Sequence, residues 1–247
     1  MKNYTKLIIT LLFAGLVYSQ SNVGGEPFSK SNKVSSEVDR VVMDSFDIQS
    51  MLDEDQSKSS GKMRYGKLFD TNISAHSKGI WETLEDGSIL WRLLISSPQA
   101  HAVSLSFSEL YIPEGGILHA YSPDYSEIRG GYTLENNSNH FSTPLITGDS
   151  IVLEYYNTLG VNDVPNFNIV EVIHDYKDLF NTIMNRDECG TNVVCSVADP
   201  YEDEINAVAW LDMGGYICSG AMINNTANDK TQYFLTANHC TQGDSPS

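Results

Sequence analysis

The sequence predicts an all-β protein whose largest part is a β-sandwich. Between residues 64 and 180, short runs rich in Val, Ile, Leu and Tyr recur at regular spacing, and Gly and Pro separate them. Regular short strands with such turns are typical of a sandwich. The chain also has 13 Tyr among its 247 residues and few long apolar runs with helical periodicity, which favours β structure over helix.

Most strands of this sandwich can be located from their pattern. The run at residues 79–96 is expected to form a hairpin around Asp86 and Gly87, because Asp-Gly favours a tight turn between two apolar runs. The run at 102–110 alternates with period two, as a half-buried strand does. Further strands are expected at 117–123, 127–133, 143–147, 150–157 and 167–176.

The first 19 residues have the features of a signal peptide. Lys2 and Lys6 form a basic start, the apolar run at 7–17 is too short to span a bilayer, and a small-residue cleavage site precedes Gln20. We therefore expect a secreted, extracellular protein without membrane contact once residues 1–19 are removed. The alternative is an uncleaved membrane anchor.

Residues 20–60 are rich in Ser, Gly, Lys, Asn and acidic residues, and we expect them to form a flexible leader. Within the leader, Ile48, Met51 and Leu52 have helical spacing, so residues 46–57 are expected either as one short amphipathic helix or as a continuing flexible arm.

The charge and the histidines exclude some functions. The formal net charge is -17, and a strongly acidic protein lacks the basic patches that nucleic-acid binding requires. The acidic surface is interpreted as a means of solubility outside the cell. The histidines at 76, 101, 119, 140 and 174 show no spacing typical of a metal site, and we expect neither a metal nor another cofactor.

The stretch at residues 216–240 carries the chemistry. It is expected to form two strands joined by a polar, turn-forming loop, and His239 and Cys240 follow the second strand directly. The chain has four cysteines, which allow three pairings, and the sequence alone does not choose among them.

This stretch resembles the lysyl endopeptidase branch of the chymotrypsin-like serine proteases. The shared features are the Cys189-x5-Cys195 spacing, the NNTAND loop at 224–229 and the YFLTANHC segment at 233–240. The segments WRLLISSP, YIPEGGILHAYSP and GDSIVLEYY further upstream are similar to the pro-region of lysyl endopeptidase precursors. The resemblance implies a bacterial protein with a removable pro-region, which assists folding and restrains activity.

The resemblance implies a division of the rest of the chain. Residues 61–180 would be the sandwich pro-region, 181–188 a processing junction, and 189–247 the incomplete first barrel of a chymotrypsin-like double β-barrel. Lys177 and Arg186 are candidate processing sites, and 205–211 would be the first strand of the barrel. We expect Trp210 and Tyr216 to pack in a core, with a position in the lining of a cleft as the alternative.

The resemblance also implies the disulfides. Cys218 would pair with Cys240, and Cys189 and Cys195 would pair with cysteines beyond Ser247.

A serine protease needs a base, a carboxylate that orients it, a nucleophilic serine and donors for the oxyanion. The resemblance makes His239 the base and places the other groups after Cys240. Ser245 follows Gly243 and Asp244, but Pro and Ser come next in place of the two glycines of the family's nucleophile turn, so we expect Ser245 to be part of a simple loop. The 247 residues alone are therefore expected to be inactive.

Two functions follow from these observations. The first is a secreted serine endopeptidase precursor that acts on protein or peptide substrates, with a preference for lysine inferred from kinship, and whose pro-region interacts with its own protease domain. The alternative is a secreted β-sandwich binding protein with a non-catalytic, protease-like tail.

Overall fold

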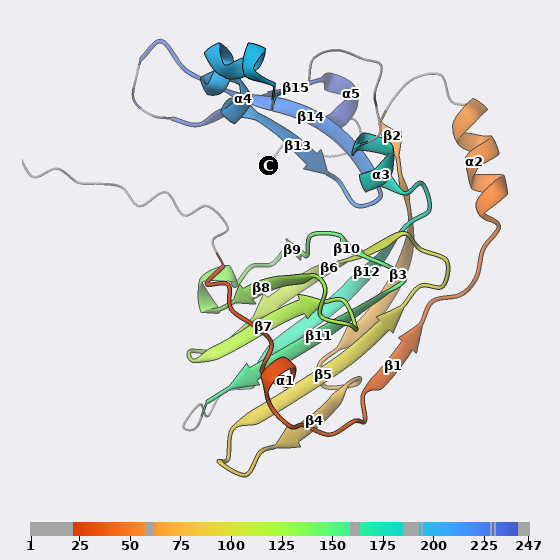
Figure 1. Cartoon of the computed structure of the whole chain (residues 1–247), viewed down its shortest axis with the longest axis vertical. Helices are drawn as coiled ribbons and strands as arrows, with labels where there is room; N and C mark the ends of the chain where they lie inside the picture. Colours follow the sequence, from red (N-terminus) through yellow and green to blue (C-terminus); the bar gives the residue numbers. More distant parts are fainter. Residues whose placement is uncertain are drawn as a thin grey trace, which may run out of the picture.

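The structure is a computed structural model that describes residues 22–57, 62–158, 164–184, 193, 195–227, 229 and 231–241. The expected signal peptide, Cys189, Arg186 and Ser245 lie outside these residues. The structure has three β-sheets, of which two face each other in the lower part of Figure 1 and the third lies above them. The predicted all-β class is confirmed.

The first sheet has the strand order β1-β5-β11-β7-β8, and β4 pairs with β5 as the predicted hairpin around Asp86 and Gly87. Its neighbouring strands are antiparallel except for β1 and β5. The strands are β1 (Asp39–Val42), β4 (Ile80–Thr83), β5 (Ile89–Ser96), β7 (Gly116–Tyr121), β8 (Ile128–Tyr132) and β11 (Ser150–Asn157).

The second sheet has the order β10-β6-β12-β3, with β9 paired to β6. Its longest ladder joins β6 and β12 and contains register shifts around Ile169. The strands are β3 (Gly66–Ser74), β6 (Ala102–Tyr111), β9 (Phe141–Ser142), β10 (Ile146–Thr147) and β12 (Asn166–Asp175).

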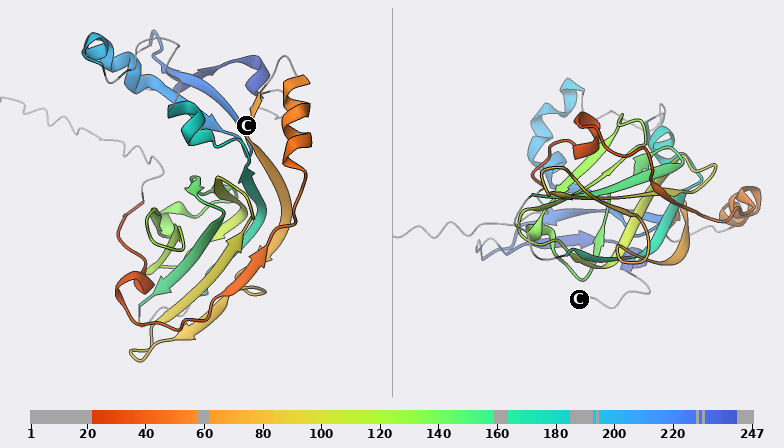
Figure 2. Two further views of the ribbon diagram at one scale, coloured as in Figure 1. Left: turned by 45° about the vertical axis from the view of Figure 1, so that its right-hand side comes forward. Right: turned by 90° about the horizontal axis from the view of Figure 1, so that it is seen from below.

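The two sheets enclose one apolar core, as the two layers in Figure 2 indicate. Trp91 of β5 is fully buried, and its ring meets Phe167 of β12 edge to face at 5.0 Å between ring centroids. Phe107 of β6 packs against Phe167 at 6.1 Å in the same way. Inward-facing aromatic residues from both sheets therefore form the core of a sandwich.

The third sheet consists of β13 (Val208–Asp212), β14 (Tyr216–Ile223), β15 (Tyr233–Thr236) and the short β2 (Met63–Arg64). It does not close into a barrel within the described residues. Of the two residues of this sheet that we expected in a core, Trp210 is 43% exposed and Tyr216 is half-buried. Leu235 of β15 is 61% exposed.

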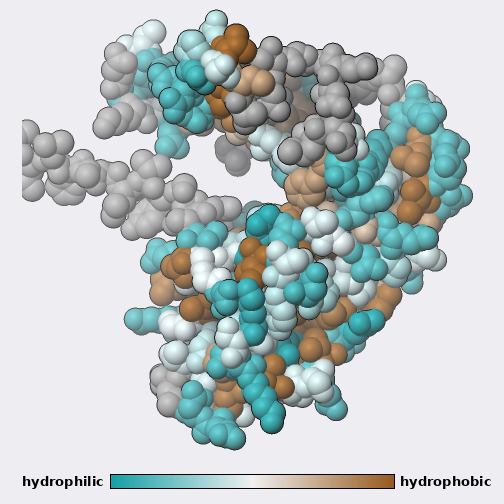
Figure 3. Space-filling model, in the orientation of Figure 1, coloured by the Kyte–Doolittle hydropathy of each residue, from teal (hydrophilic) through white to brown (hydrophobic). Residues whose placement is uncertain are grey.

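The helices are short and lie mostly outside the sandwich, and no helix in the described ranges is long and apolar enough to cross a membrane. They are α1 (Phe28–Ser31), α2 (Ile48–Ser57), η1 (Leu134–Asn136), α3 (Leu179–Met184), η2 (Ser196–Tyr201), α4 (Glu202–Ala207) and α5 (Asn238–Thr241). The face drawn in Figure 3 is mainly hydrophilic, in keeping with the acidic composition.

The leader differs from the flexible segment that we expected. It contributes β1 to the first sheet, and Phe28 stacks on Tyr156 of β11 at 4.5 Å between ring centroids. The Ser29 amide donates to the buried carboxylate of Glu154 at 3.1 Å, and the Tyr121 hydroxyl donates to the same carboxylate at 2.9 Å. Its helix, by contrast, is present as α2.

The first strand of the third sheet begins later than we expected. Residues 205–207 belong to α4, and only Val208 begins β13. Three acidic residues occupy the first turn of α4, where they interact favourably with the positive end of the helix dipole. This local preference extends the helix into the apolar run that predicted a strand.

We expect Gly79→Ala to destabilise the sandwich by about 1 to 2 kcal/mol. Gly79 has φ of +88°, and a Cβ there would lie 2.2 Å from Nε1 of the buried Trp91. Gly25→Ala is the matched control, because Gly25 has φ of +90° and no atom within 4 Å of its added Cβ. Urea unfolding of both variants separates the steric cost from the backbone cost, and equal losses would contradict the steric argument.

Candidate active site around His239

The candidate site is built on the hairpin of β14 and β15. The pairing runs from Gly220 opposite Thr236 to Ile223 opposite Tyr233. A Cβ on Gly220 would lie 2.3 Å from the Phe234 ring and 2.6 Å from a backbone oxygen of β15, so only glycine permits this close approach. The glycine of the Cys-Ser-Gly motif thus lets the second strand reach its place.

A disulfide closes the end of this hairpin. Cys218 of β14 is bonded to Cys240 of α5, with 6.0 Å between the Cα atoms, as the resemblance implied. Cys240 is 2% exposed, and its amide donates to the carbonyl of Ala237 at 2.9 Å. The covalent link and the helical turn together fix the backbone on both sides of His239.

His239 itself is exposed. A ring nitrogen of His239 and the two sulfurs of Cys218 and Cys240 lie within 4.8 Å of one another. The two sulfurs are bonded to each other, so they do not offer thiolates to a metal. Within the described residues, no carboxylate lies within ion-pair distance of His239 and no serine hydroxyl is hydrogen-bonded to it. The imidazole is therefore open to groups that approach from solvent.

The loop between β14 and β15 is organised by Asp229. Its carboxylate accepts from the Asn225 side-chain amide at 2.5 Å and from the Thr231 backbone amide at 2.9 Å. The hydrogen bonds from Asn225 and Thr231 lower the pKa of Asp229 to about 2. The NNTAND segment therefore contains an ionised aspartate that holds the turn in shape at neutral pH.

Of the other predicted residues, only Cys195 and Lys177 lie in the described part of the chain, and no contact joins either of them to His239. Cys195 is an exposed free thiol before η2. The ammonium group of Lys177 pairs with Asp55 at 2.7 Å, and the Lys177 side chain is 20% exposed. Cleavage after Lys177 therefore requires this ion pair to open.

A contact that we did not predict connects the candidate site to the sandwich. The hydroxyl of the fully buried Tyr65 donates to Oδ1 of Asp212 in β13 at 2.9 Å. Although Asp212 as a residue is exposed, desolvation of its carboxyl raises the pKa, and the hydrogen bonds from Tyr65 and Gly214 partly oppose this shift. The sequence could not have predicted this hydrogen bond. Asp212 is followed by Met-Gly-Gly at a strand end, which indicates a turn but does not indicate that Tyr65 is the partner of Asp212.

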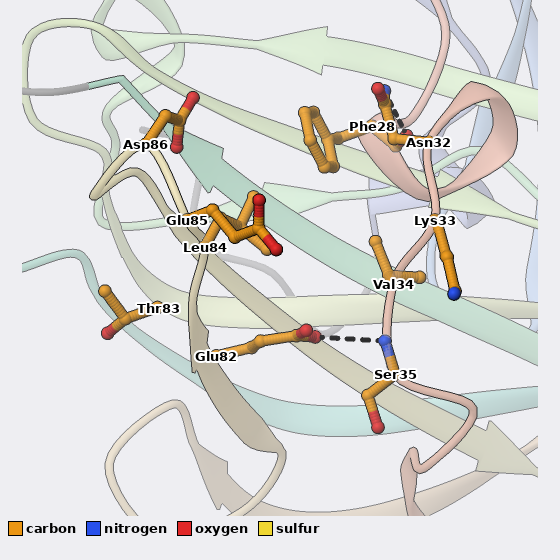
Figure 4. A pocket seen from close by; sticks show the side chains of 10 residues that line it. All are labelled: Phe28, Asn32, Lys33, Val34, Ser35, Glu82, Thr83, Leu84, Glu85 and Asp86. Carbon is orange, nitrogen blue, oxygen red and sulfur yellow. Dashed lines mark hydrogen bonds between the residues drawn. The ribbon is translucent and has the colours of Figure 1, made fainter.

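A pocket lies on the sandwich, away from His239, between the leader and the hairpin of β4 and β5 (Figure 4). Its volume is about 720 Å³, and the Ser35 amide donates to Glu82 across it at 3.3 Å. The residues that line it are Phe28, Asn32, Lys33, Val34, Ser35, Glu82, Thr83, Leu84, Glu85 and Asp86. It contains three carboxylates and one ammonium group but no histidine, cysteine or activated serine.

A protein-family model described as the C-terminal domain of lysyl endopeptidase matches residues 183–247 of this chain. The matched stretch contains β13, β14, β15, the disulfide and His239. This part of the chain is therefore related to a family of peptidases.

Among solved structures, an isomalto-dextranase of Arthrobacter globiformis T6, complexed with panose, is 13% identical over 38% of this chain and 17% of that chain, with a TM-score of 0.19. The chain thus spans only a small share of that enzyme's length. A TM-score this low supports no inference about fold or function.

Proposed function

We propose that this chain belongs to a secreted serine endopeptidase precursor that cleaves peptides after lysine, with His239 as its general base. The observation that carries the proposal is an exposed imidazole fixed beside the Cys218–Cys240 disulfide, in a stretch that matches the lysyl endopeptidase model. A disulfide next to the base suits this chemistry, because a small misplacement of a catalytic group lowers the rate strongly.

In the proposed mechanism, His239 accepts the proton of a serine hydroxyl as that oxygen attacks the scissile carbonyl. The imidazolium then returns the proton to the leaving amine, and water repeats the cycle on the acyl-enzyme. The serine, the orienting carboxylate and the oxyanion donors are proposed to come from residues other than those described around His239. The open face of its imidazole is compatible with their approach.

The sandwich at residues 61–180 is proposed to be the pro-region, together with the leader at 20–60 and after a signal peptide at 1–19. The junction at 181–188 would be cut when the enzyme matures. The proposal is supported by the hydrogen bond between Tyr65 and Asp212, which connects the sandwich to the strand that precedes the candidate site.

The proposal is tested on the whole polypeptide that the gene encodes, secreted and matured by its host. We expect it to cleave fluorogenic peptides with Lys before the scissile bond at least about tenfold faster than Arg peptides, and to react covalently with a fluorophosphonate. Absence of both cleavage and labelling would contradict the proposal. The pocket in Figure 4 would then be the place to search for a ligand of a secreted binding protein.

A further inference from the structure

Part of one edge of β14, close to the candidate site, is occupied by β2, which directly precedes the sandwich strand β3 in the chain. β13 pairs with residues 217–221 along one edge of β14, so β15 and β2 must share the other edge. On this shared edge β15 covers residues 220–223, and β2 covers residues 216 and 217. The backbone of β2 thus continues the line of β15 beyond the point where β15 ends.

This placement brings β2 beside the candidate site. Met63 is opposite Ile217, and the next residue along β14 is Cys218, whose sulfur is bonded to Cys240. The sulfurs lie within 4.8 Å of a ring nitrogen of His239. The strand β2 therefore lies along the part of β14 that precedes Cys218, and the disulfide joins this part of β14 to the short helix α5, which carries His239.

Residues of helix α2 bind the side chain of Arg64 in β2. Nε of Arg64 donates to Asp55 at 2.8 Å, and Nη2 of Arg64 reaches Glu54 at 3.1 Å and the carbonyl oxygen of Met51 at 3.2 Å. The Arg64 side chain is 12% exposed. A largely covered arginine with two carboxylates and a carbonyl makes a strong latch, because charge-assisted hydrogen bonds are stronger than neutral ones.

The residues that follow β2 are fixed as well. The amides of Tyr65 and Gly66 both donate to the carbonyl of Gly215, at 2.8 and 3.0 Å. Ile217 of β14 packs against the cluster that contains Tyr65 and Leu179. Backbone hydrogen bonds, an apolar contact and the Arg64 latch therefore all keep this segment on the edge of β14.

We infer that Met63–Arg64 is an internal strand-addition ligand, which withholds this edge of β14, beside His239, from an extended peptide. Adding a strand to an exposed sheet edge is a common way to bind extended peptides, since main-chain hydrogen bonds supply affinity for many sequences. The peptide that competes with β2 would be the substrate, so this inference rests on the proposed function. The segment would then restrain the precursor until the pro-region leaves.

The test breaks the ion pairs of Arg64 with Asp55 and Glu54 and then measures peptide binding. Arg64→Glu places a third carboxylate beside Asp55 and Glu54, and we expect the repulsion to release β2. Arg40→Glu is the matched control, because Arg40 is exposed and the change in net charge is the same. The probe is a fluorescein-labelled peptide with the sequence of residues 62–66, and binding is followed by anisotropy in whole protein that also carries His239→Ala, so that the probe is not consumed.

We expect Arg64→Glu to lower the apparent Kd of the probe at least about tenfold. The apparent Kd is the intrinsic Kd divided by the fraction of molecules whose β14 edge is free, and release of β2 increases that fraction. Arg40→Glu should bind as the parent does. Tyr65→Phe removes only the hydrogen bond to Asp212 and should lower the Kd of the probe about threefold. If circular dichroism shows that Arg64→Glu is unfolded, the Kd of Tyr65→Phe alone tests the inference. Unchanged Kd in the folded variants overturns the inference.

Peptidase activity separates the two proposals. Binding of the probe needs no nucleophile, so tighter binding in a protein without peptidase activity would retain the strand-addition edge and overturn only the proposed function. Conversely, an active peptidase whose Arg64→Glu precursor binds the probe and cleaves lysyl peptides at the parent level would retain the function and overturn the inference.

Discussion

His239→Ala should reduce kcat/KM for a lysyl peptide by about 10⁴-fold or more in the mature enzyme, because the serine then lacks the base that removes its proton. The loss should lie mainly in kcat, since a base acts on the reacting atoms and contributes little to peptide binding. The measurement is steady-state cleavage of a fluorogenic lysyl amide by secreted, matured protein. The rate of fluorophosphonate labelling should fall in parallel, because labelling needs the same activated serine.

The controls for this experiment must separate chemistry from folding. His76→Ala removes an exposed histidine of the sandwich and should leave processing and secretion of the precursor unchanged. Free-thiol titration of His239→Ala should match that of the parent, because the imidazole does not take part in the Cys218–Cys240 bond. If His239→Ala cleaves within a few-fold of the parent, His239 is not the general base.

Local chemistry made several elements predictable from the sequence. Asp86 and Gly87 bend the chain between two apolar runs, and both strands of that hairpin can be recognised without any distant partner. The strands of the candidate site are equally local, because they are neighbours in the sequence and the connection at 224–232 is rich in turn formers. The sequence pattern therefore located His239 shortly after the second strand, although the structure places it in the short helix α5 and not directly at the end of β15.

Elements that depend on distant partners were missed. β1 lies in a polar, Ser-rich leader, and only its pairing with β5, about 50 residues away, makes it a strand. β2 has two residues and pairs with β14 about 150 residues later in the chain. No local periodicity indicates either contact, and the link between the sandwich and the candidate site therefore emerges only in three dimensions.

A buried histidine leads to the second large effect, a loss of sandwich stability in mild acid. His174 of β12 has no exposed surface, and its Nδ1 lies 2.8 Å from the Ser97 hydroxyl. Its Nε2 is buried without a hydrogen-bond partner in the described structure, and the Phe46 ring meets the imidazole edge to face at 4.8 Å between centroids. Phe69 lies farther out, at 6.4 Å. A proton on this ring would be a charge in apolar surroundings.

Burial lowers the pKa of His174 to about 4, and the positive charges of His101 and Lys67 act in the same direction. The pKa of an unfolded histidine is about 6.5, so the folded state binds this proton less readily than the unfolded state does. The stabilisation from His174 is therefore complete above pH 6.5 and is lost as the pH falls towards 4. The loss amounts to about 3 kcal/mol, from the linkage between proton binding and unfolding.

The neighbouring carboxyl of Asp175 affects the pH dependence of stability in the opposite direction. Burial raises the pKa of Asp175, although hydrogen bonds from the Leu179 and Lys177 amides oppose the shift. A carboxyl whose pKa is raised on folding stabilises the protein at low pH and loses that contribution as the pH rises. The pH profile of the parent protein therefore contains both effects, and only a difference between variants isolates His174.

His174→Gln supplies that difference, because glutamine does not titrate and still offers polar atoms to Ser97. From pH 7 to pH 4, the free energy of unfolding of the parent should fall by about 3 kcal/mol more than that of His174→Gln. His76→Gln, at an exposed site, should follow the parent within about 0.5 kcal/mol. The measurement is urea unfolding at both pH values, followed by near-UV circular dichroism. If the free energy of unfolding falls equally in the parent and in His174→Gln, the acid sensitivity arises from other groups. The buried position of His174 would then not disfavour its protonation.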